Sequence, residues 1–180
     1  KLPPYKICAK GIAKTSQIVQ SFPEMTATEN VLVGALFGGG GRTERKKDAM
    51  DRSKELLKFV GLPEKKFGVA VKSLNIIELR RVQLAKALAT EPKLLLLDEL
   101  LAGLNPKEID GAIELIKSIR DQGVTILIVE HVMRVIMGLC DQVTVLHHGE
   151  KISEGPPQEV IRNEDVIKIY LGKKYLLYGG

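Results

Sequence analysis

Four consecutive leucines run directly into two acidic residues at positions 94–99, and no other stretch constrains the fold as strongly. A short, uninterrupted apolar run predicts a strand buried on both faces, which is typical of parallel α/β sheets. Ligands of such sheets bind beyond the carboxyl ends of the strands. We therefore expect Asp98 and Glu99 to lie over a cleft, where a metal ion with phosphates is a common ligand of paired acids.

Helix and strand patterns alternate on both sides of this strand, from about residue 76 onward. A helix is expected over residues 76–90, with Asn75 as N-cap and Glu78 completing a capping box. A further helix is expected from Pro106, and the apolar run at 125–129 predicts a second buried strand. The alternation indicates βαβ units and a parallel sheet.

The first half of the chain does not show this alternation of helices and strands. A short strand is expected at about 11–16, followed by helices from near Thr28 and over about 43–60. These helices predict an α-helical subdomain inserted into the sheet-forming part. We expect an α/β core of residues 1–17 and 89–180, and a helical subdomain of residues 18–88.

Composition limits the kinds of partner. A formal net charge of +5 favours anionic ligands such as nucleotides or phospholipid headgroups. Aromatic residues make up only 4% of the chain, Trp is absent, and the basic residues form no long stripe, so we expect no nucleic-acid partner. No apolar run approaches the length of a membrane span.

The polar residues that follow the strands are expected to have different roles in one site. Asp98 is expected to hold Mg²⁺, directly or through water, and Glu99 to accept a proton from an attacking water or to orient it. His131 follows the second buried strand, so we expect its imidazole at the same edge of the sheet, where it can bond a phosphate. Gln17, after the first short strand, offers an amide to the metal or its water. Arg80 and Arg81 are expected to form ion pairs on a helix surface.

The order of these features resembles the ATP-binding subunit of ABC transporters. The resemblance rests on Gln17 and then, in order, on SLNIIELRRVQLAKAL (73–88), LLLLDE (94–99), AGLNP (102–106), VEHVM (129–133) and HHGEKISEGPP (147–157). The stretches EMTATENVLVGALFGG and ATEPKLLLLDE are most similar to the ATPase subunits of branched-chain amino-acid importers. The resemblance implies a P-loop NTPase-like parallel sheet flanked by helices, with ATP and Mg²⁺ as cofactors. It also implies a dimer with a second ATPase subunit, integral membrane permease subunits, and a cytoplasmic location on the inner face of the membrane.

The resemblance assigns a role to each matching residue. Asp98 and Glu99 match the metal-binding aspartate and the catalytic glutamate, Gln17 the glutamine that senses Mg²⁺, and His131 the switch histidine. The signature segment, which caps the ATP of the other subunit, corresponds to Asn75, Ile76, Ile77 and Glu78. The loop that communicates across the dimer corresponds to Ala102, Gly103, Leu104 and Asn105.

Two features depart from the family pattern. The chain contains no G-x-x-x-x-G-K-[ST] phosphate loop, and LFGGGGRT at 36–43, which follows an expected helix, reads as a surface loop. Ile76 and Ile77 replace the glycines of the signature, and their branched side chains obstruct close approach of a phosphate. We therefore expect the chain to lack the N-terminal part that carries the phosphate loop, and to bind ATP weakly or not at all by itself.

Two other functions remain open at this point. One is a nucleotide-free remnant that acts as an interaction or scaffold module, which the two departures favour. The other is a soluble ABC protein of DNA repair or translation. The short helical insertion argues against the repair type, which has a long coiled coil.

Overall fold

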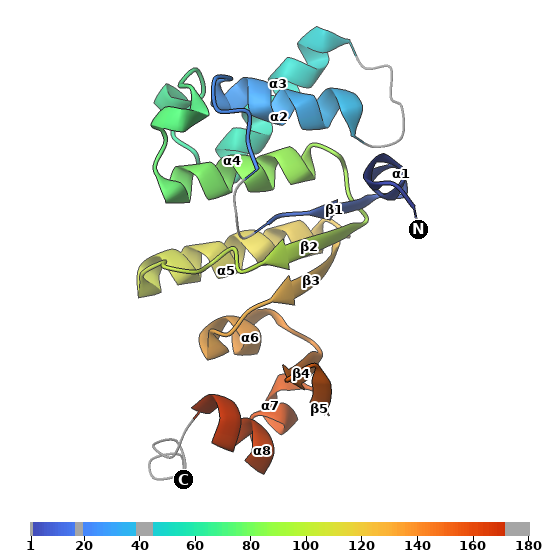
Figure 1. Cartoon of the computed structure of the whole chain (residues 1–180). Coiled ribbons are helices and arrows are strands. Elements are labelled where there is room, and N and C mark those ends of the chain that lie inside the picture. Colours follow the sequence, from blue (N-terminus) through green and yellow to red (C-terminus); the bar gives the residue numbers. More distant parts are fainter. Residues whose placement is uncertain (1, 17–19, 39–44, 172–180) are drawn as a thin grey trace. The chain divides into compact units, whose positions relative to one another are not determined.

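The computed structural model describes residues 2–16, 20–38 and 45–171, and the chain divides into two compact units (Figure 1). The first unit ends at Val129 and the second begins at Glu130. Over the described residues, no helix combines the length and the apolar character that crossing a membrane requires.

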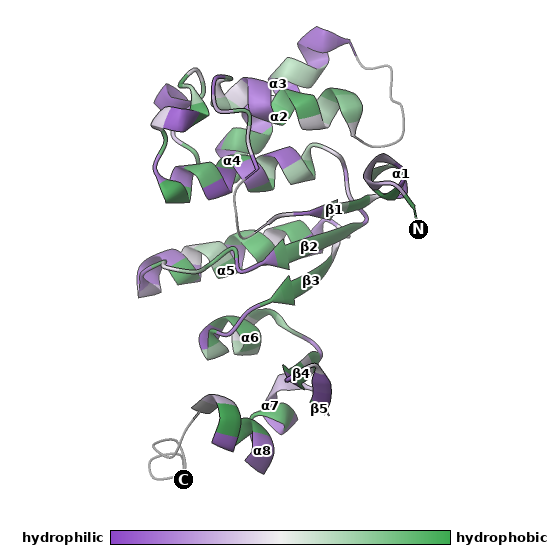
Figure 2. Ribbon diagram, in the orientation of Figure 1, coloured by the Kyte–Doolittle hydropathy of each residue, from purple (hydrophilic) through white to green (hydrophobic). Residues whose placement is uncertain are grey.

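A 3-stranded parallel sheet, in the order β1-β2-β3, lies at the centre of the first unit. The strands are β1 (Ile12–Lys14), β2 (Leu94–Asp98) and β3 (Thr125–Val129), and β2 and β3 are predominantly apolar (Figure 2). Leu95 and Leu97 of β2 are 0% and 1% exposed, so this strand forms part of the core. The predicted parallel sheet is confirmed, although β1 is shorter than the expected 11–16.

The last strand of this sheet is less buried than its sequence suggests. Leu127 and Val129 of β3 are 55% and 54% exposed, so the prediction of a strand buried on both faces is wrong. Successive residues of a strand point to opposite faces, so Leu127 and Val129, which are two positions apart, share one face. An apolar run shows that a strand tolerates burial on both sides, but it does not show that something covers each side.

α5 (Pro106–Asp121) begins as predicted, with Asn105 as N-cap and a complete capping box with Glu108. Its apolar stripe consists of Ile113, Ile116 and Ile119, which are 7%, 3% and 1% exposed. This stripe is narrower than the sequence pattern suggested, because Ile109 and Ala112 are only partly buried. The stripe anchors α5 in the core of the first unit.

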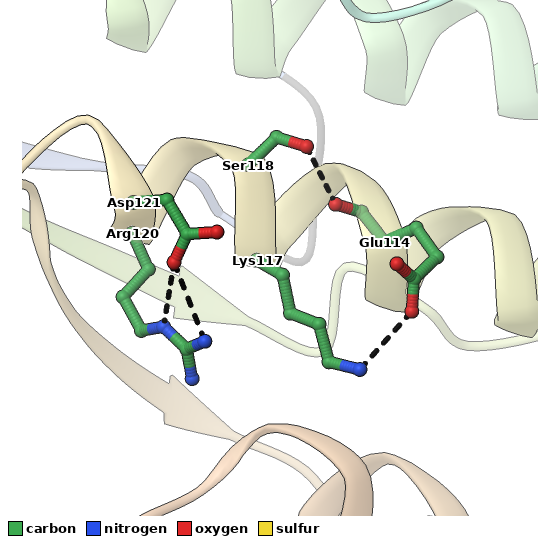
Figure 3. A network of polar contacts seen from close by, with 5 residues as sticks. All are labelled: Glu114, Lys117, Ser118, Arg120 and Asp121. Carbon is green, nitrogen blue, oxygen red and sulfur yellow. Dashed lines mark hydrogen bonds and ion pairs between the residues drawn. The ribbon is translucent and has the colours of Figure 1, made fainter.

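The opposite side of α5 carries polar contacts (Figure 3). Lys117 Nζ lies 3.0 Å from a carboxylate oxygen of Glu114, and an Arg120 guanidinium nitrogen lies 3.4 Å from Asp121 Oδ1. The Ser118 hydroxyl donates to the Glu114 carbonyl oxygen at 2.9 Å. Ion pairs this exposed contribute at most about 1 kcal/mol each, so they mark a solvated face and not a site.

Three helices form a layer beyond β1: α2 (Ala27–Phe37), α3 (Lys46–Phe59) and α4 (Ile76–Leu88). α2 begins slightly earlier than expected because Thr26 caps it. The Thr26 hydroxyl accepts the Glu29 N–H at 3.2 Å, and a Glu29 carboxylate oxygen accepts the Thr26 N–H at 2.8 Å. This capping box was readable in the sequence and was missed.

α2 and α4 approach each other closely at Gly34. A Cβ atom on Gly34 would lie 2.4 Å from the carbonyl oxygen of Lys86 on α4, closer than real Cβ contacts allow. The absence of a side chain is therefore required here. Two 3₁₀ turns, η1 (Glu64–Lys66) and η2 (Val71–Ser73), connect α3 to α4.

The remaining elements are α1 before β1 and the whole of the second unit. α1 spans Pro4–Ala9, and the second unit contains α6 (Met133–Leu139), β4 (Val143–His147), β5 (Glu150–Gly155), α7 (Pro157–Val160), α8 (Glu164–Val166) and η3 (Ile167–Leu171). β4 and β5 form an antiparallel hairpin. Its turn residues His148 and Gly149 have φ values of 48° and 85°, as tight hairpin turns of this hand require.

Candidate functional site

The two predicted acids lie where β2 ends beside β3. Asp98 pairs in register with Val129, and the backbone N–H of Glu99 donates to the Val129 carbonyl oxygen at 3.1 Å. The chain therefore turns away from the sheet directly after Asp98, and both acids lie at the carboxyl edge of the strands. Each side chain is partly exposed, as a ligand site at this edge requires.

Two consecutive residues of the β1 segment hold Asp98. The Thr15 side-chain oxygen accepts the backbone N–H of Asp98 at 3.4 Å, and the Thr15 hydroxyl donates to the Leu96 carbonyl oxygen at 3.5 Å. Lys14 Nζ lies 3.1 Å from a carboxylate oxygen of Asp98. No local sequence pattern pointed to these partners, because they are more than eighty positions away from Asp98 and depend on strand pairing.

The residues at this edge fit a magnesium ion that arrives with phosphates. The Asp98 carboxylate already has a cation, the Lys14 ammonium, at contact distance. Within the described ranges, no group of three or more His, Cys, Asp or Glu residues is placed to hold a metal. Mg²⁺ commonly binds through one or two carboxylates together with substrate phosphates and water, so a single carboxylate is enough for such a site.

Glu99 has an unusual backbone conformation. Its φ angle is +47°, in the left-handed region that side-chain-bearing residues rarely adopt. Such a residue costs about 1–3 kcal/mol and persists where the surrounding structure, or a function, requires it. Here the strained turn places a carboxylate immediately beyond the end of a core strand.

The signature segment begins α4 as predicted. The Asn75 side chain accepts the Glu78 N–H at 2.9 Å, and the Glu78 carboxylate accepts the Asn75 N–H at 3.0 Å. This second bond holds the pKa of Glu78 below its ordinary value of 4.5; burial opposes the shift, and Lys66 and Arg81 assist it. Ile76, the first helical residue, is 54% exposed. The helix N-terminus is therefore well formed, and an apolar side chain projects from it.

Arg80 connects α4 to the loop at 102–105. Its guanidinium donates to the carbonyl oxygen of Ala102, and Arg81 donates to the carbonyl oxygen of Gly61 at 2.6 Å. The hydrogen bonds of both arginines go to main-chain oxygens, which the sequence did not predict, and Arg81 also acts on the Glu78 carboxylate through its charge. Gly103 in the loop has φ of +78°. A hollow of about 490 Å³ lies between the loop, α4 and α5, with Ile77, Leu104 and Asn105 among its lining residues.

Two further residues were predicted to belong to the site. Gln17 lies outside the described residues. His131 is exposed and belongs to the second unit, two residues after the end of β3. The roles of Gln17 and His131 stay predictions.

Asn30 is a structural residue that the sequence did not reveal. Its side chain is 0% exposed, and its amide donates to the carbonyl oxygens of Phe22, Met25 and Thr26 at 3.0–3.3 Å. Its carbonyl oxygen accepts the Phe22 N–H at 2.8 Å. Asn30 therefore fixes the segment that leads from the region of Gln17 into α2.

Comparison with known proteins defines the family. Residues 3–102 match the ABC transporter family, and residues 150–175 match the family described as branched-chain amino acid ATP-binding cassette transporter. The chain belongs to the ABC transporter family. The matched region contains β1, α4 and β2, and so most of the candidate site.

Individual relatives agree with this assignment. The chain is 36% identical to the high-affinity branched-chain amino acid transport ATP-binding protein BraF of Pseudomonas aeruginosa, over 96% of this chain and 72% of that protein. It is 38% identical to the corresponding protein LivG of Salmonella typhimurium, over the same shares of the two chains, 96% and 72%.

A solved structure shows the same fold. The dimeric ATP-binding cassette MJ0796, bound to ADP and Pi, superposes with a TM-score of 0.76 at 27% identity. The match covers 84% of this chain and 65% of that one. The α/β cassette fold predicted from the sequence is confirmed.

Proposed function

We propose that this chain is the ATP-binding and ATP-hydrolysing subunit that energises an importer of branched-chain, hydrophobic amino acids. The names of BraF and LivG, at 36% and 38% identity, support the substrate class. In this proposal the subunit works in the cytoplasm, on the inner face of the membrane, beneath integral permease subunits. It pairs with a second ATPase subunit, as MJ0796 does in its dimer.

One observation carries the proposal. β2 ends in Asp98 and the next residue, Glu99, leaves the sheet in a strained left-handed turn at its carboxyl edge. A partly exposed carboxylate that can face a phosphate-bound metal, followed directly by a second carboxylate, suits the hydrolysis of a terminal phosphate.

In this proposal, each residue of the candidate site has its own role in ATP binding or hydrolysis. Mg²⁺, when bound, neutralises charge on the phosphate oxygens. Asp98 faces this cation, Glu99 orients and deprotonates the attacking water, and His131 and Gln17 contact the terminal phosphate and the metal. Asn75, Ile76, Ile77 and Glu78 cap the nucleotide of the partner, and the loop at 102–105 contacts the partner. The division into a core of 1–17 and 89–180 and a helical subdomain of 18–88 belongs to the same proposal.

A nucleotide-free interaction module is the second candidate. Ile76 stands where the family has glycine, and its exposed side chain projects from the helix N-terminus that would meet a phosphate. The chain also contains no sequence of the phosphate-loop pattern. These two observations reduce the expected affinity of this chain for ATP, and they favour the module if binding is absent.

The two candidates differ in a direct measurement. The purified chain is titrated with a fluorescent ATP analogue with and without Mg²⁺, and phosphate release is followed in parallel. The transporter proposal predicts weak, Mg²⁺-dependent binding and slow turnover that Glu99→Gln lowers about 100-fold or more. Glu114→Gln, on the solvated face of α5, is the matched control and leaves turnover unchanged. Absence of binding at millimolar nucleotide would refute the proposal and select the module.

A further inference from the structure

Lys14 and Asp98 face each other across two neighbouring strands. Lys14 pairs in register with Leu96, and Asp98 lies two residues further along β2, so both side chains are on the same face of the sheet. Their charged atoms lie 3.1 Å apart. The ion pair therefore follows from the register of β1 and β2 and not from a chance meeting of mobile side chains.

The environment makes this ion pair reversible. The Lys14 side chain is 54% exposed and the Asp98 side chain 33% exposed, so water screens the attraction. Lysine has a flexible four-carbon stem and carries a compact point charge, so its ammonium can leave without disturbing the backbone. Asp98 is less free, because its N–H is bonded to buried Thr15.

We propose that Lys14 is the counter-ion of Asp98 in the nucleotide-free chain and that a divalent cation displaces it. This inference rests on the proposed metal role of Asp98. Two cations in contact with one carboxylate repel each other, so the metal and the Lys14 ammonium compete for it. Lys14 thereby lowers the affinity of the Asp98 edge for a divalent cation.

Cation binding tests the competition. Mn²⁺ replaces Mg²⁺ as the probe and is titrated by electron paramagnetic resonance in the presence of saturating ADP. Lys14→Met is expected to bind Mn²⁺ about 2–5-fold more tightly than the wild type, which is the range of a weak exposed ion pair. Lys14→Arg keeps the positive charge and is expected to restore wild-type affinity. Lys10→Met, an exposed lysine at the end of α1, is the control for the change in net charge.

A second measurement needs no metal. The thermal midpoints of Lys14→Met, Asp98→Asn and the double variant are compared with that of the wild type in chelator. If the ion pair forms in solution, the effects of the single changes are non-additive by about 1–3 °C. Additive midpoints would overturn the inference, because no ion pair would then exist to be displaced.

The outcomes separate the inference from the proposed function. If Mn²⁺ binds in the presence of nucleotide, but Lys14→Met and Lys10→Met have the same affinity for it, the role of Lys14 is refuted and the metal role of Asp98 is not. Absence of such binding in all four proteins would refute the metal role of Asp98. Tighter binding by Lys14→Met, with wild-type affinity for Lys14→Arg, would establish the competition.

Discussion

The backbone N–H of Asp98 is bonded to the side-chain oxygen of Thr15, 83 positions earlier in the chain, at 3.4 Å. Thr15 is 1% exposed, so the core of the sheet holds the residue proposed to face the metal. The β1 segment thus positions the residue through Thr15, and β2 supplies the carboxylate of Asp98. A substitution can remove either contribution separately.

Thr15→Val keeps the shape of the side chain and removes its hydroxyl. We expect a loss of about 1 kcal/mol in the free energy of unfolding, measured with urea, because two hydrogen bonds are lost. Thr28→Val is the matched control, since the buried Thr28 hydroxyl donates to the Phe67 carbonyl oxygen at 3.0 Å, away from the acids. Both changes are expected to destabilise the fold, but only Thr15→Val should weaken nucleotide-dependent Mn²⁺ binding. Equal weakening by both would show that Thr15 has no specific role in placing Asp98.

Asn30→Ala leaves three main-chain carbonyl oxygens and one N–H without their side-chain partner. We expect a loss of about 3 kcal/mol in the free energy of unfolding, because buried polar groups left without a partner are costly. Asn163→Ala, which removes only the cap of α8, is the comparison and should cost about 1 kcal/mol. Equal losses from the two changes would mean that the segment before α2 needs no anchor.

Glu99→Gly is expected to separate stability from activity. Glycine adopts φ of +47° without steric cost, so the free energy of unfolding should rise by about 1 kcal/mol. Turnover should fall to background, because the carboxylate is gone. Glu99→Gln is the paired variant: it should lose turnover equally but gain no stability. A Glu99→Gly protein that is no more stable than Glu99→Gln would show that the turn is not strained.

Glu78→Gln tests the capping box at the start of α4 through its pH dependence. The pKa of Glu78 is lowered in the folded chain, chiefly by the hydrogen bond from the Asn75 N–H. Its contribution is therefore fully present above pH 4.5, the ordinary pKa of a glutamate, and is lost as pH falls through the lower folded-state value.

Urea unfolding at several pH values gives the measurement. At pH 7, Glu78→Gln should be less stable than the wild type by about 0.3–1 kcal/mol, because the glutamine lacks the negative charge at the helix N-terminus. The difference should shrink as the pH is lowered below 4.5. Glu114→Gln removes only an exposed ion pair and should change the stability by less than about 0.5 kcal/mol. A difference that does not depend on pH would show that the charge of Glu78 makes no contribution.

Local signals in the sequence predicted the elements well. The caps at Asn75 and Asn105 were readable because a capping box involves residues only three positions apart. The strand before Asp98 was equally clear from its apolar run. The family pattern then supplied roles that no local pattern contains, such as the assignment of His131.

Long-range relationships were not readable in the same way. The exposure of Leu127 and Val129 depends on what lies against the face of β3. The partners of Arg80 and Arg81 depend on how α4 meets two loops. Lys14 and Asp98 meet only because β1 and β2 pair in a particular register. Residue type and spacing along the chain do not encode any of these contacts.

The close contact at Gly34 bears on how motion would pass through the helical layer. A side chain between two helices acts as a compressible spacer, and at this point none is present, because the backbone of α2 meets the carbonyl of Lys86 directly. A displacement of α2 would therefore be passed on to α4 with little loss. If the proposed function holds, a force on the helical layer would in this way move the helix that begins with Ile76 and Ile77.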